Sequence, residues 1–183
     1  MDNAIIQAMK ERRSCRKFKP DPVPRGLVEQ VAEAGLWAAS GMGGQAVKIV
    51  VVEEPSLRAR LAAANCRIGG WPEGFDPFYG APVVLAVIAD KSAFTAVYDG
   101  SLVMGNLMLA AHSLGLGSIW IHRAKEEFDS PEGKALLRSL DIEGDWEGIG
   151  HCALGWADGA LPAGAPRKPG RIVWADSDAG RAP

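Results

Sequence analysis

The chain has 183 residues, of which 48% are hydrophobic and 23% are charged, and its formal net charge is −2. This composition excludes a disordered body and predicts a single domain over residues 1–183 with a core of its own. The nearly neutral charge gives no reason to expect nucleic acid as a partner.

Apolar periodicity and turn residues divide the chain into helices and strands. Helical spacing predicts helices over 4–11, 24–37, 55–65, 99–116 and 130–140. Apolar and β-branched runs predict strands over 48–52, 82–89, 118–121 and 149–156. The last stretch, 157–183, is rich in Pro, Gly and Ala and has a strand-like segment at 172–174. Because it holds too little apolar material to fold alone, we expect it to lie against this domain or a partner.

A basic segment, residues 11–18, follows the first predicted helix. Five of its eight side chains can donate hydrogen bonds to an anion, and guanidinium groups match the planar geometry of phosphate oxygens. In an extended segment, the period of two would place Arg12, Ser14 and Arg16 on one face, with Cys15 and Phe18 less constrained. The segment alone is also compatible with a solvated basic turn.

Two loops and one helix carry further signals. Three glycines within residues 40–45 permit close backbone approaches, although a helix end followed by a flexible loop explains them equally well. Residues 68–81 combine glycine, proline and aromatic residues without a regular period, which is typical of a loop that covers a site. The helix predicted at 99–116 is apolar almost all round, which predicts burial in the domain centre or in a subunit interface.

Other chemistries lack their sequence signatures. Three cysteines without CxxC spacing indicate reduced thiols, and His112, His122 and His151 lie far apart in the sequence, so no metal site is indicated. Ser118 lacks the glycine of a nucleophile elbow, and the Gly-Leu-Gly at 115–117 precedes a strand, unlike a dinucleotide fingerprint. With no signal peptide and no bilayer-spanning apolar run, we expect a cytoplasmic protein without a membrane partner. The basic segment, the glycine loop and the aromatic loop together predict a site for a flat phosphorylated molecule.

Three ordered motifs resemble the FMN-dependent nitroreductases. They are the Arg-Arg-Ser-Cys-Arg-Lys-Phe segment at 12–18, the glycine loop at 37–45, and the residues at 99–106 and 115–122. The resemblance implies an α+β fold with a central, mostly antiparallel sheet of four or five strands flanked by helices. It also implies an intertwined homodimer with FMN at each subunit interface and a C-terminal tail, 157–183, that reaches the partner.

The resemblance implies cofactor-binding roles position by position. The phosphate and ribityl end of FMN is assigned to Arg12, Arg13 and Ser14, with Arg167 and Lys168 returning from the tail. Arg16 would lie near the pyrimidine edge, where a guanidinium stabilises the negative charge of reduced flavin. The residues contributed by the partner subunit would be Ser40, Gly41 and Gln45. The residues lining the ring near its reactive edge would be Trp120, Ile121, His122 and Arg123. No residue is assigned as catalytic, because the chemistry takes place on the flavin.

The implied activity is reduction of nitroaromatics, quinones or similar small oxidants by NADH or NADPH, with both substrates using one site in turn, which predicts ping-pong kinetics. One alternative is an FMN carrier or sensor with little turnover, and another is a phosphate-binding domain without flavin. The loop departs from the family pattern at Ala39, Gly43, Ala46 and Val47, where Pro, Asn, Pro and an aromatic residue are common. These departures leave substrate preference open.

Overall fold

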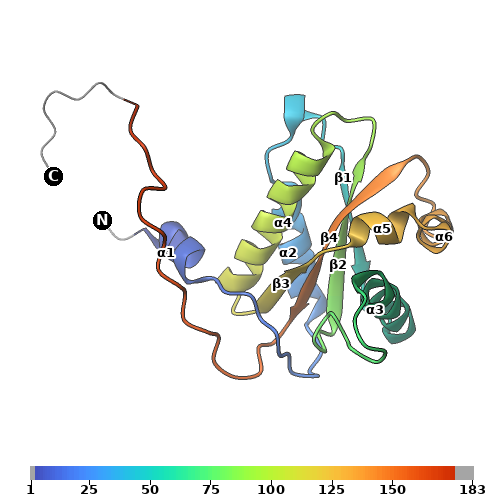
Figure 1. The fold of residues 1–183 in the computed structure, drawn as a ribbon, viewed down its shortest axis with the longest axis horizontal. Helices are drawn as coiled ribbons and strands as arrows, with labels where there is room; N and C mark the ends of the chain where they lie inside the picture. The colour runs from blue at the N-terminus through green and yellow to red at the C-terminus, as the bar shows by residue number, and fades with distance from the viewer. Residues whose placement is uncertain (1–2, 176–183) are drawn as a thin grey trace, which may run out of the picture.

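The computed structural model describes residues 3–175, and its centre is a four-stranded antiparallel sheet (Figure 1). The strands are β1 (Val47–Val52), β2 (Val83–Asp90), β3 (Gly117–Ile121) and β4 (Trp146–Gly155), in the order β1-β2-β4-β3. The first seven residues of β2 are fully buried, as expected for an apolar run in the middle of a sheet. All four strands were predicted from sequence, and the α+β fold class is confirmed.

Helices surround the sheet. They are α1 (Ala4–Glu11), α2 (Arg25–Leu36), α3 (Pro55–Gly69), α4 (Ala96–Ser113), α5 (Ala124–Asp129) and α6 (Pro131–Ser139), with one 3₁₀ turn, η1 (Gly41–Gly43). Side-chain oxygens of Asn3, Glu54 and Ser130 accept hydrogen bonds from backbone N–H groups at the starts of α1, α3 and α6. These caps satisfy donors that the first helical turn leaves free.

The core has two layers, one on each face of the sheet. Helices α2 and α4 cover one face, where Val31 and Leu107 pack with Leu85 of β2. Helices α3, α5 and α6 cover the other, where Phe128 packs in the same cluster as Ile88 of β2. The alternation of β2 side chains between the two layers follows from the period of two of a strand.

Several boundaries differ from those predicted. Helix α3 continues to Gly69 instead of ending at residue 65, because Gly70 adopts the left-handed conformation (φ 66°) that closes a helix. Helix α4 runs from 96 to 113, and the left-handed Gly115 (φ 76°) follows its end. Helix α5 was not predicted. The strand-like segment at 172–174 is exposed and forms no ladder with any other described residue.

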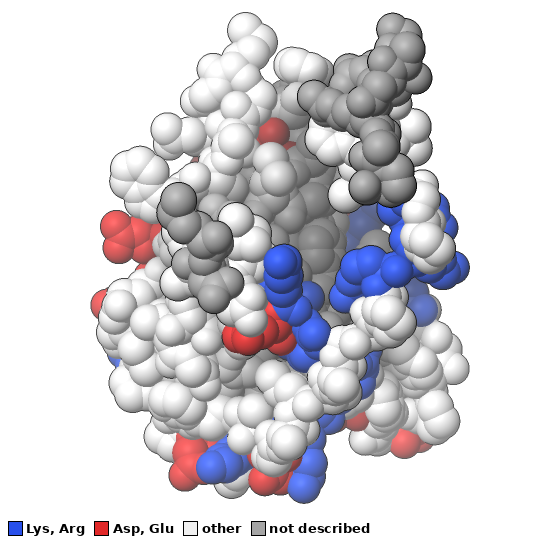
Figure 2. Space-filling view, turned by 90° about the vertical axis from the view of Figure 1, so that its left-hand side faces the viewer, with Lys and Arg blue, Asp and Glu red and all other residues white. Residues whose placement is uncertain are grey.

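The chain beyond β4 leaves the body of the domain and runs back past α1 (Figure 1). Figure 2 shows the face that carries α1 and this tail, and Lys and Arg side chains gather across its middle. Part of the predicted tail, residues 176–183, lies outside the described residues. Within residues 3–175, no helix combines the length and the apolar character needed to cross a bilayer.

Candidate cofactor site at the edge of the sheet

The basic segment is extended and lies beside the edge strand β3. Ser14 forms a parallel bridge with Ser118, and the Cys15 N–H donates to the Ser118 carbonyl at 3.0 Å. Cys15 and Phe18 are buried in the core, which the sequence did not predict. A Cβ at Gly117 would lie 3.0 Å from the Cys15 side chain, so glycine allows this close approach. The backbone is therefore fixed, and Arg16 projects from it as an exposed side chain.

Arg13 turns back onto the end of α1. Its Nη1 donates to the Lys10 carbonyl at 2.6 Å and to the Arg12 carbonyl at 2.8 Å. These carbonyls belong to the end of a helix, where acceptors lack partners within the helix. The tail also reaches this side chain, because a Cβ at Gly164 would overlap the Arg13 guanidinium. Arg13 thus connects α1, the basic segment and the tail.

The remaining donors of the segment fit a phosphate. The Nη1 atom of Arg12 is buried and has no hydrogen-bond partner in the described structure. Within residues 3–175, Arg12, Arg13 and Arg16 form no salt bridge, whereas Lys17 pairs with Asp158 at 2.6 Å. Guanidinium groups without a counter-charge are the donors that a phosphate monoester requires. The residues present therefore fit the phosphate end of FMN.

The predicted tail residues lie close to this group along the chain. Arg167 and Lys168 are exposed and follow Gly164, the residue in contact with Arg13, by three and four positions. Neither side chain forms a salt bridge among residues 3–175. Their assignment to the phosphate thus stays a prediction.

The glycine loop is held by a buried carboxylate at the start of α4. The Gly41 N–H donates to both carboxylate oxygens of Asp99, at 3.1 and 3.2 Å, and Thr95 Oγ1 donates to the same carboxylate at 3.0 Å. The Ser40 hydroxyl accepts from the Gln45 N–H at 3.1 Å. A Cβ at Gly41 would overlap Thr95 Oγ1, so only glycine fits there without rearrangement. The sequence analysis missed this anchor because Asp99 lies 58 positions away.

The structure does not bring the basic segment and the glycine loop together. The loop is attached to Asp99 in the first turn of α4, and the basic segment is attached to Ser118, just beyond the other end of that helix. Ser113 lies fourteen positions beyond Asp99 along the helix, a rise of about 21 Å. Figure 1 shows η1 and the basic segment toward opposite ends of α4. One chain therefore carries two separate parts of the predicted site.

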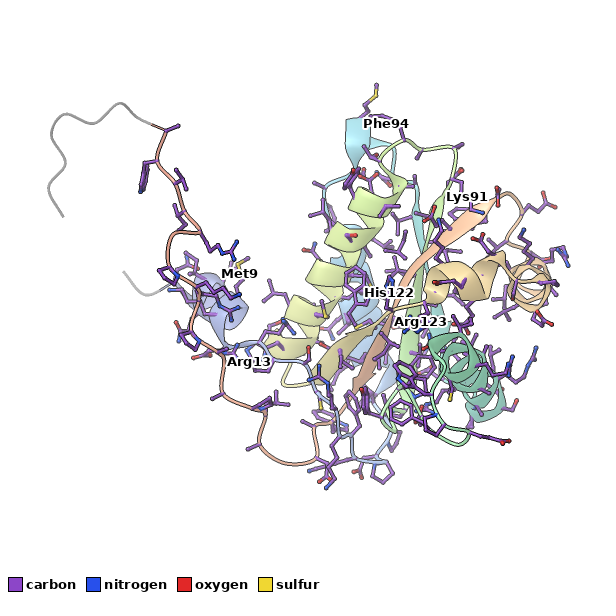
Figure 3. The ribbon with its side chains drawn as sticks, viewed as in Figure 1. Met9, Arg13, Lys91, Phe94, His122 and Arg123 are labelled. Atoms are coloured by element: carbon purple, nitrogen blue, oxygen red, sulfur yellow. The ribbon has the colours of Figure 1, made fainter. Side chains whose placement is uncertain are left out.

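The far end of β3 carries the residues predicted to line the flavin ring. Trp120 is half-buried and packs over Gly150, while Ile121 is buried. His122 is exposed, and its carbonyl accepts from Asn65 Nδ2 at 2.8 Å. Figure 3 shows His122 and Arg123 side by side where β3 ends, with Arg13 at the foot of α1. The basic segment and these residues thus share the same edge of the sheet.

The aromatic loop after α3 is tied down by Asp76. This carboxylate accepts from Arg58 at 2.6 Å, from the Phe78 N–H at 2.9 Å and from the Gly80 N–H at 2.8 Å. Burial raises the pKa of Asp76, but the hydrogen bonds from Arg58, Gly80 and Phe78 outweigh it and lower the pKa below its ordinary value. A cavity of about 560 Å³ lies between α3 and this loop, and Trp71 is among its lining residues.

A second buried polar pair lies behind the β3 end. His151 Nε2 and Glu127 Oε2 are 2.7 Å apart, and both side chains are almost fully buried. His151 also lies edge-on to Phe78, with ring centres 5.3 Å apart. No local sequence pattern predicted this contact, because Glu127 and His151 approach each other only when α5 packs on β4. They position the β3–α5 turn and do not line the basic segment.

The cysteines do not offer a reactive group. Cys15, Cys66 and Cys152 are free and buried. Burial raises the pKa of the Cys152 thiol to about 12, with the Arg12 charge acting in the opposite direction. Burial also raises the pKa of Cys15. Because the thiolate is the nucleophile, the raised pKa values of Cys15 and Cys152 disfavour their reactive form at neutral pH. Among residues 3–175, no three His, Cys, Asp or Glu side chains gather as metal ligands would.

The fold is an antiparallel sheet between two helical layers, and an arginine-rich segment lies along one edge of the sheet. The chain belongs to the nitroreductase family. The family model matches residues 9–67 and 72–156. The resemblance inferred from the three motifs is confirmed.

Individual relatives agree with this assignment. A nitroreductase with bound FMN from Bacteroides fragilis is 29% identical with a TM-score of 0.85, covering 96% of this chain and 100% of its own. One with bound FMN from Desulfitobacterium hafniense is 26% identical with a TM-score of 0.85, again covering 96% and 100%. An NADPH-dependent oxidoreductase from Staphylococcus epidermidis is 28% identical over 66% of this chain. The chain spans only 54% of that protein's length.

Proposed function

We propose that this chain is an FMN-dependent NAD(P)H oxidoreductase that reduces nitroaromatics, quinones or similar small oxidants. The observation that carries the proposal is the set of guanidinium groups at Arg12, Arg13 and Arg16, held beside β3 without a carboxylate partner among residues 3–175. When bound, FMN would accept a hydride from the reduced nicotinamide and deliver electrons to the oxidant.

The residues of this chain would bind and orient the cofactor. Arg12, Arg13 and Ser14 would hold the phosphate and the ribityl chain, and Arg167 and Lys168 would add charge from the tail. Arg16 would stabilise negative charge at the pyrimidine edge, which makes reduction of the ring more favourable. The residues at the end of β3 would pack beside the ring and exclude water from its reactive edge. No protein acid is needed, because water can supply the protons.

We further propose that a second copy of the chain completes each site. The loop carrying Ser40, Gly41 and Gln45 lies at the opposite end of α4 from the basic segment, so it would serve the site of the partner. Exposed apolar side chains support such a contact, including Ile5 of α1, which is 63% exposed, and Leu102 of α4, which is 51% exposed. Sedimentation of the purified protein as a dimer would agree with this arrangement, and a monomer that retains FMN would contradict it.

The cysteine chemistry supports a reducing compartment such as the cytoplasm. The three thiols are free and buried apart from one another in the described structure, as is usual for proteins that fold where disulfides do not persist.

Absorbance and turnover test the function together. We expect purified protein to be yellow, to consume NADH or NADPH with menadione or a nitroaromatic, and to give parallel double-reciprocal lines. Intersecting lines would contradict the ping-pong scheme. Yellow protein without turnover would indicate the alternative, an FMN carrier or sensor. Colourless protein that takes up no added FMN would refute the flavin assignment itself.

A further inference from the structure

Arg123 is held in a backbone conformation that its side chain disfavours. Its φ is +78°, in the left-handed region, where residues other than glycine are uncommon. It occupies the position between the end of β3 and the start of α5. Such conformations persist only where the surroundings enforce them. The contacts around Arg123 must therefore explain its position.

Buried polar groups fix the turn on both sides of Arg123. Asn65, which is fully buried, donates to the His122 carbonyl at 2.8 Å. The Glu127 N–H donates to the Arg123 carbonyl at 3.1 Å, and the Glu127 carboxylate pairs with His151 at 2.7 Å. Hydrogen bonds from residues of α3, α5 and β4 therefore hold this turn in place. The backbone of Arg123 has little freedom to move.

The side chain of Arg123 is fixed as well. Its guanidinium carbon lies 5.3 Å from the centre of the Trp71 ring, a cation–π distance. A Cβ at Gly69 would lie 3.0 Å from Arg123 Nε, so the stem of the side chain is confined between the Trp71 loop and α3. Arg123 Nε is buried and has no hydrogen-bond partner in the described structure.

The charge of Arg123 has no counter-charge among residues 3–175. No salt bridge of the described chain includes it. Arg58, which flanks the same aromatic loop, is paired with Asp76 at 2.6 Å. Glu127, four positions further along the chain, faces His151 and not Arg123. Arg123 is thus a positioned, half-buried cation beside an indole ring that is 39% exposed.

We propose that Arg123 and Trp71 select electron acceptors that carry a carboxylate on an aromatic ring. This inference rests on the proposed function, which places the end of β3 beside the flavin. A guanidinium fork binds carboxylate through two parallel hydrogen bonds, and the neighbouring indole offers a flat apolar surface to the ring of the acceptor. A neutral acceptor would leave the guanidinium without an anion, so the site discriminates by charge.

Two matched acceptors and one inert ligand test the proposal on the FMN-loaded protein. 4-Nitrobenzoate and 4-nitrobenzyl alcohol differ in the carboxylate, and benzoate binds without being reduced. We expect benzoate to perturb the visible flavin spectrum and Arg123→Gln to weaken its binding about tenfold, as expected for the loss of a charge-assisted hydrogen bond. The ratio of kcat/KM for nitrobenzoate to that for nitrobenzyl alcohol should fall about tenfold in the same variant.

Controls make each outcome decisive. Arg138→Gln removes an exposed arginine of α6 and should leave the ratio unchanged. Arg123→Lys keeps the charge without the fork, so it should lower the ratio less than Arg123→Gln and serves if the glutamine variant does not fold. An unchanged ratio of kcat/KM in Arg123→Gln overturns the proposal. This includes the case in which the variant slows reduction of the flavin by NADH and so lowers kcat/KM equally for both acceptors. Protein that binds FMN but reduces neither acceptor overturns the proposed function, and this inference with it.

Discussion

The two ends of α4 carry parts of the candidate site that are built in different ways. At the end near β3, the backbone of the basic segment is bound to the sheet, and its three arginine side chains form no salt bridge among residues 3–175. At the other end, the buried Asp99 side chain binds the backbone of the glycine loop, while Met42 of that loop is 94% exposed. The first part offers charge, and the second offers a shaped backbone.

This difference predicts how substitutions in each part affect ligand affinity and stability. A site made of free side chains should lose ligand affinity when one is removed, with little change in stability. A loop held by one buried carboxylate should lose stability when that anchor is removed, because donors are left unpaired. Four substitutions test this contrast.

Asp99→Ala should lower the free energy of unfolding by about 3 kcal/mol, because it leaves the Gly41 N–H and Thr95 Oγ1 without their acceptor in a buried position. Urea unfolding measures the change. Glu33→Ala, at an exposed position of α2, is the control and should stay within about 0.5 kcal/mol of the unmodified protein. A loss no larger than that of the control would show that Asp99 does not anchor the loop.

Arg12→Ala should weaken FMN binding about thirtyfold, or about 2 kcal/mol, with little change in stability, because it removes a charge-assisted donor. Fluorescence titration of the apoprotein with FMN measures the affinity. Lys17→Ala is the matched control, since Lys17 is exposed and already paired with Asp158. Equal affinities for the Arg12 and Lys17 variants would remove Arg12 from the phosphate site.

Gly41→Ala should lower the free energy of unfolding by about 1–2 kcal/mol, because the added methyl group overlaps Thr95. Thermal unfolding measures the effect. Gly26→Ala is the control, as no heavy atom lies within 4 Å of a Cβ there, and it should be neutral or slightly stabilising within a helix. A neutral Gly41→Ala would mean that the loop can shift away from Thr95 without cost.

Asp76→Asn tests whether a carboxylate nearer the surface anchors a loop as Asp99 does. The pKa of Asp76 is lowered in the folded state, so its stabilising effect is complete well above the ordinary aspartate pKa of about 3.9 and disappears as pH falls through the lowered folded value. The variant should be less stable by about 1 kcal/mol at pH 7, and this difference should shrink as the pH falls below the ordinary aspartate pKa of about 3.9. Urea unfolding over a series of pH values checks this, and a pH-independent difference would contradict it.

The sequence predicted the parts of the fold that depend on neighbouring residues. All four strands follow β-branched or apolar runs, and the helix at α6 follows the Ser-Pro start at residues 130 and 131. Local patterns also located the basic segment, which is extended beside β3, and the glycine loop. Motif order, which spans most of the chain, was enough to identify the family.

What the sequence did not predict depends on contacts between distant residues. The Asp99 anchor joins positions 58 apart, and the Asn65 bond to His122 joins positions 57 apart. Helix α5 has only six residues and no side-chain cap at its N-terminus, so it exists mainly through packing of Phe128 and pairing of Glu127 with His151. Such contacts are consequences of the fold and leave no periodic pattern in the sequence.

The two hydrogen bonds from Arg13 to the end of α1 affect the entropy of ligand binding. A free arginine gives up about 2 kcal/mol of rotamer entropy when a ligand orders it. Arg13 is already ordered by hydrogen bonds to the carbonyls of Lys10 and Arg12, so its rotamer entropy is lost during folding and not during ligand binding. The helix end thereby preorganises a residue that we propose binds the phosphate. A change in α1 that never touches the ligand, such as an unfolded last turn, should then weaken anion binding by releasing this side chain.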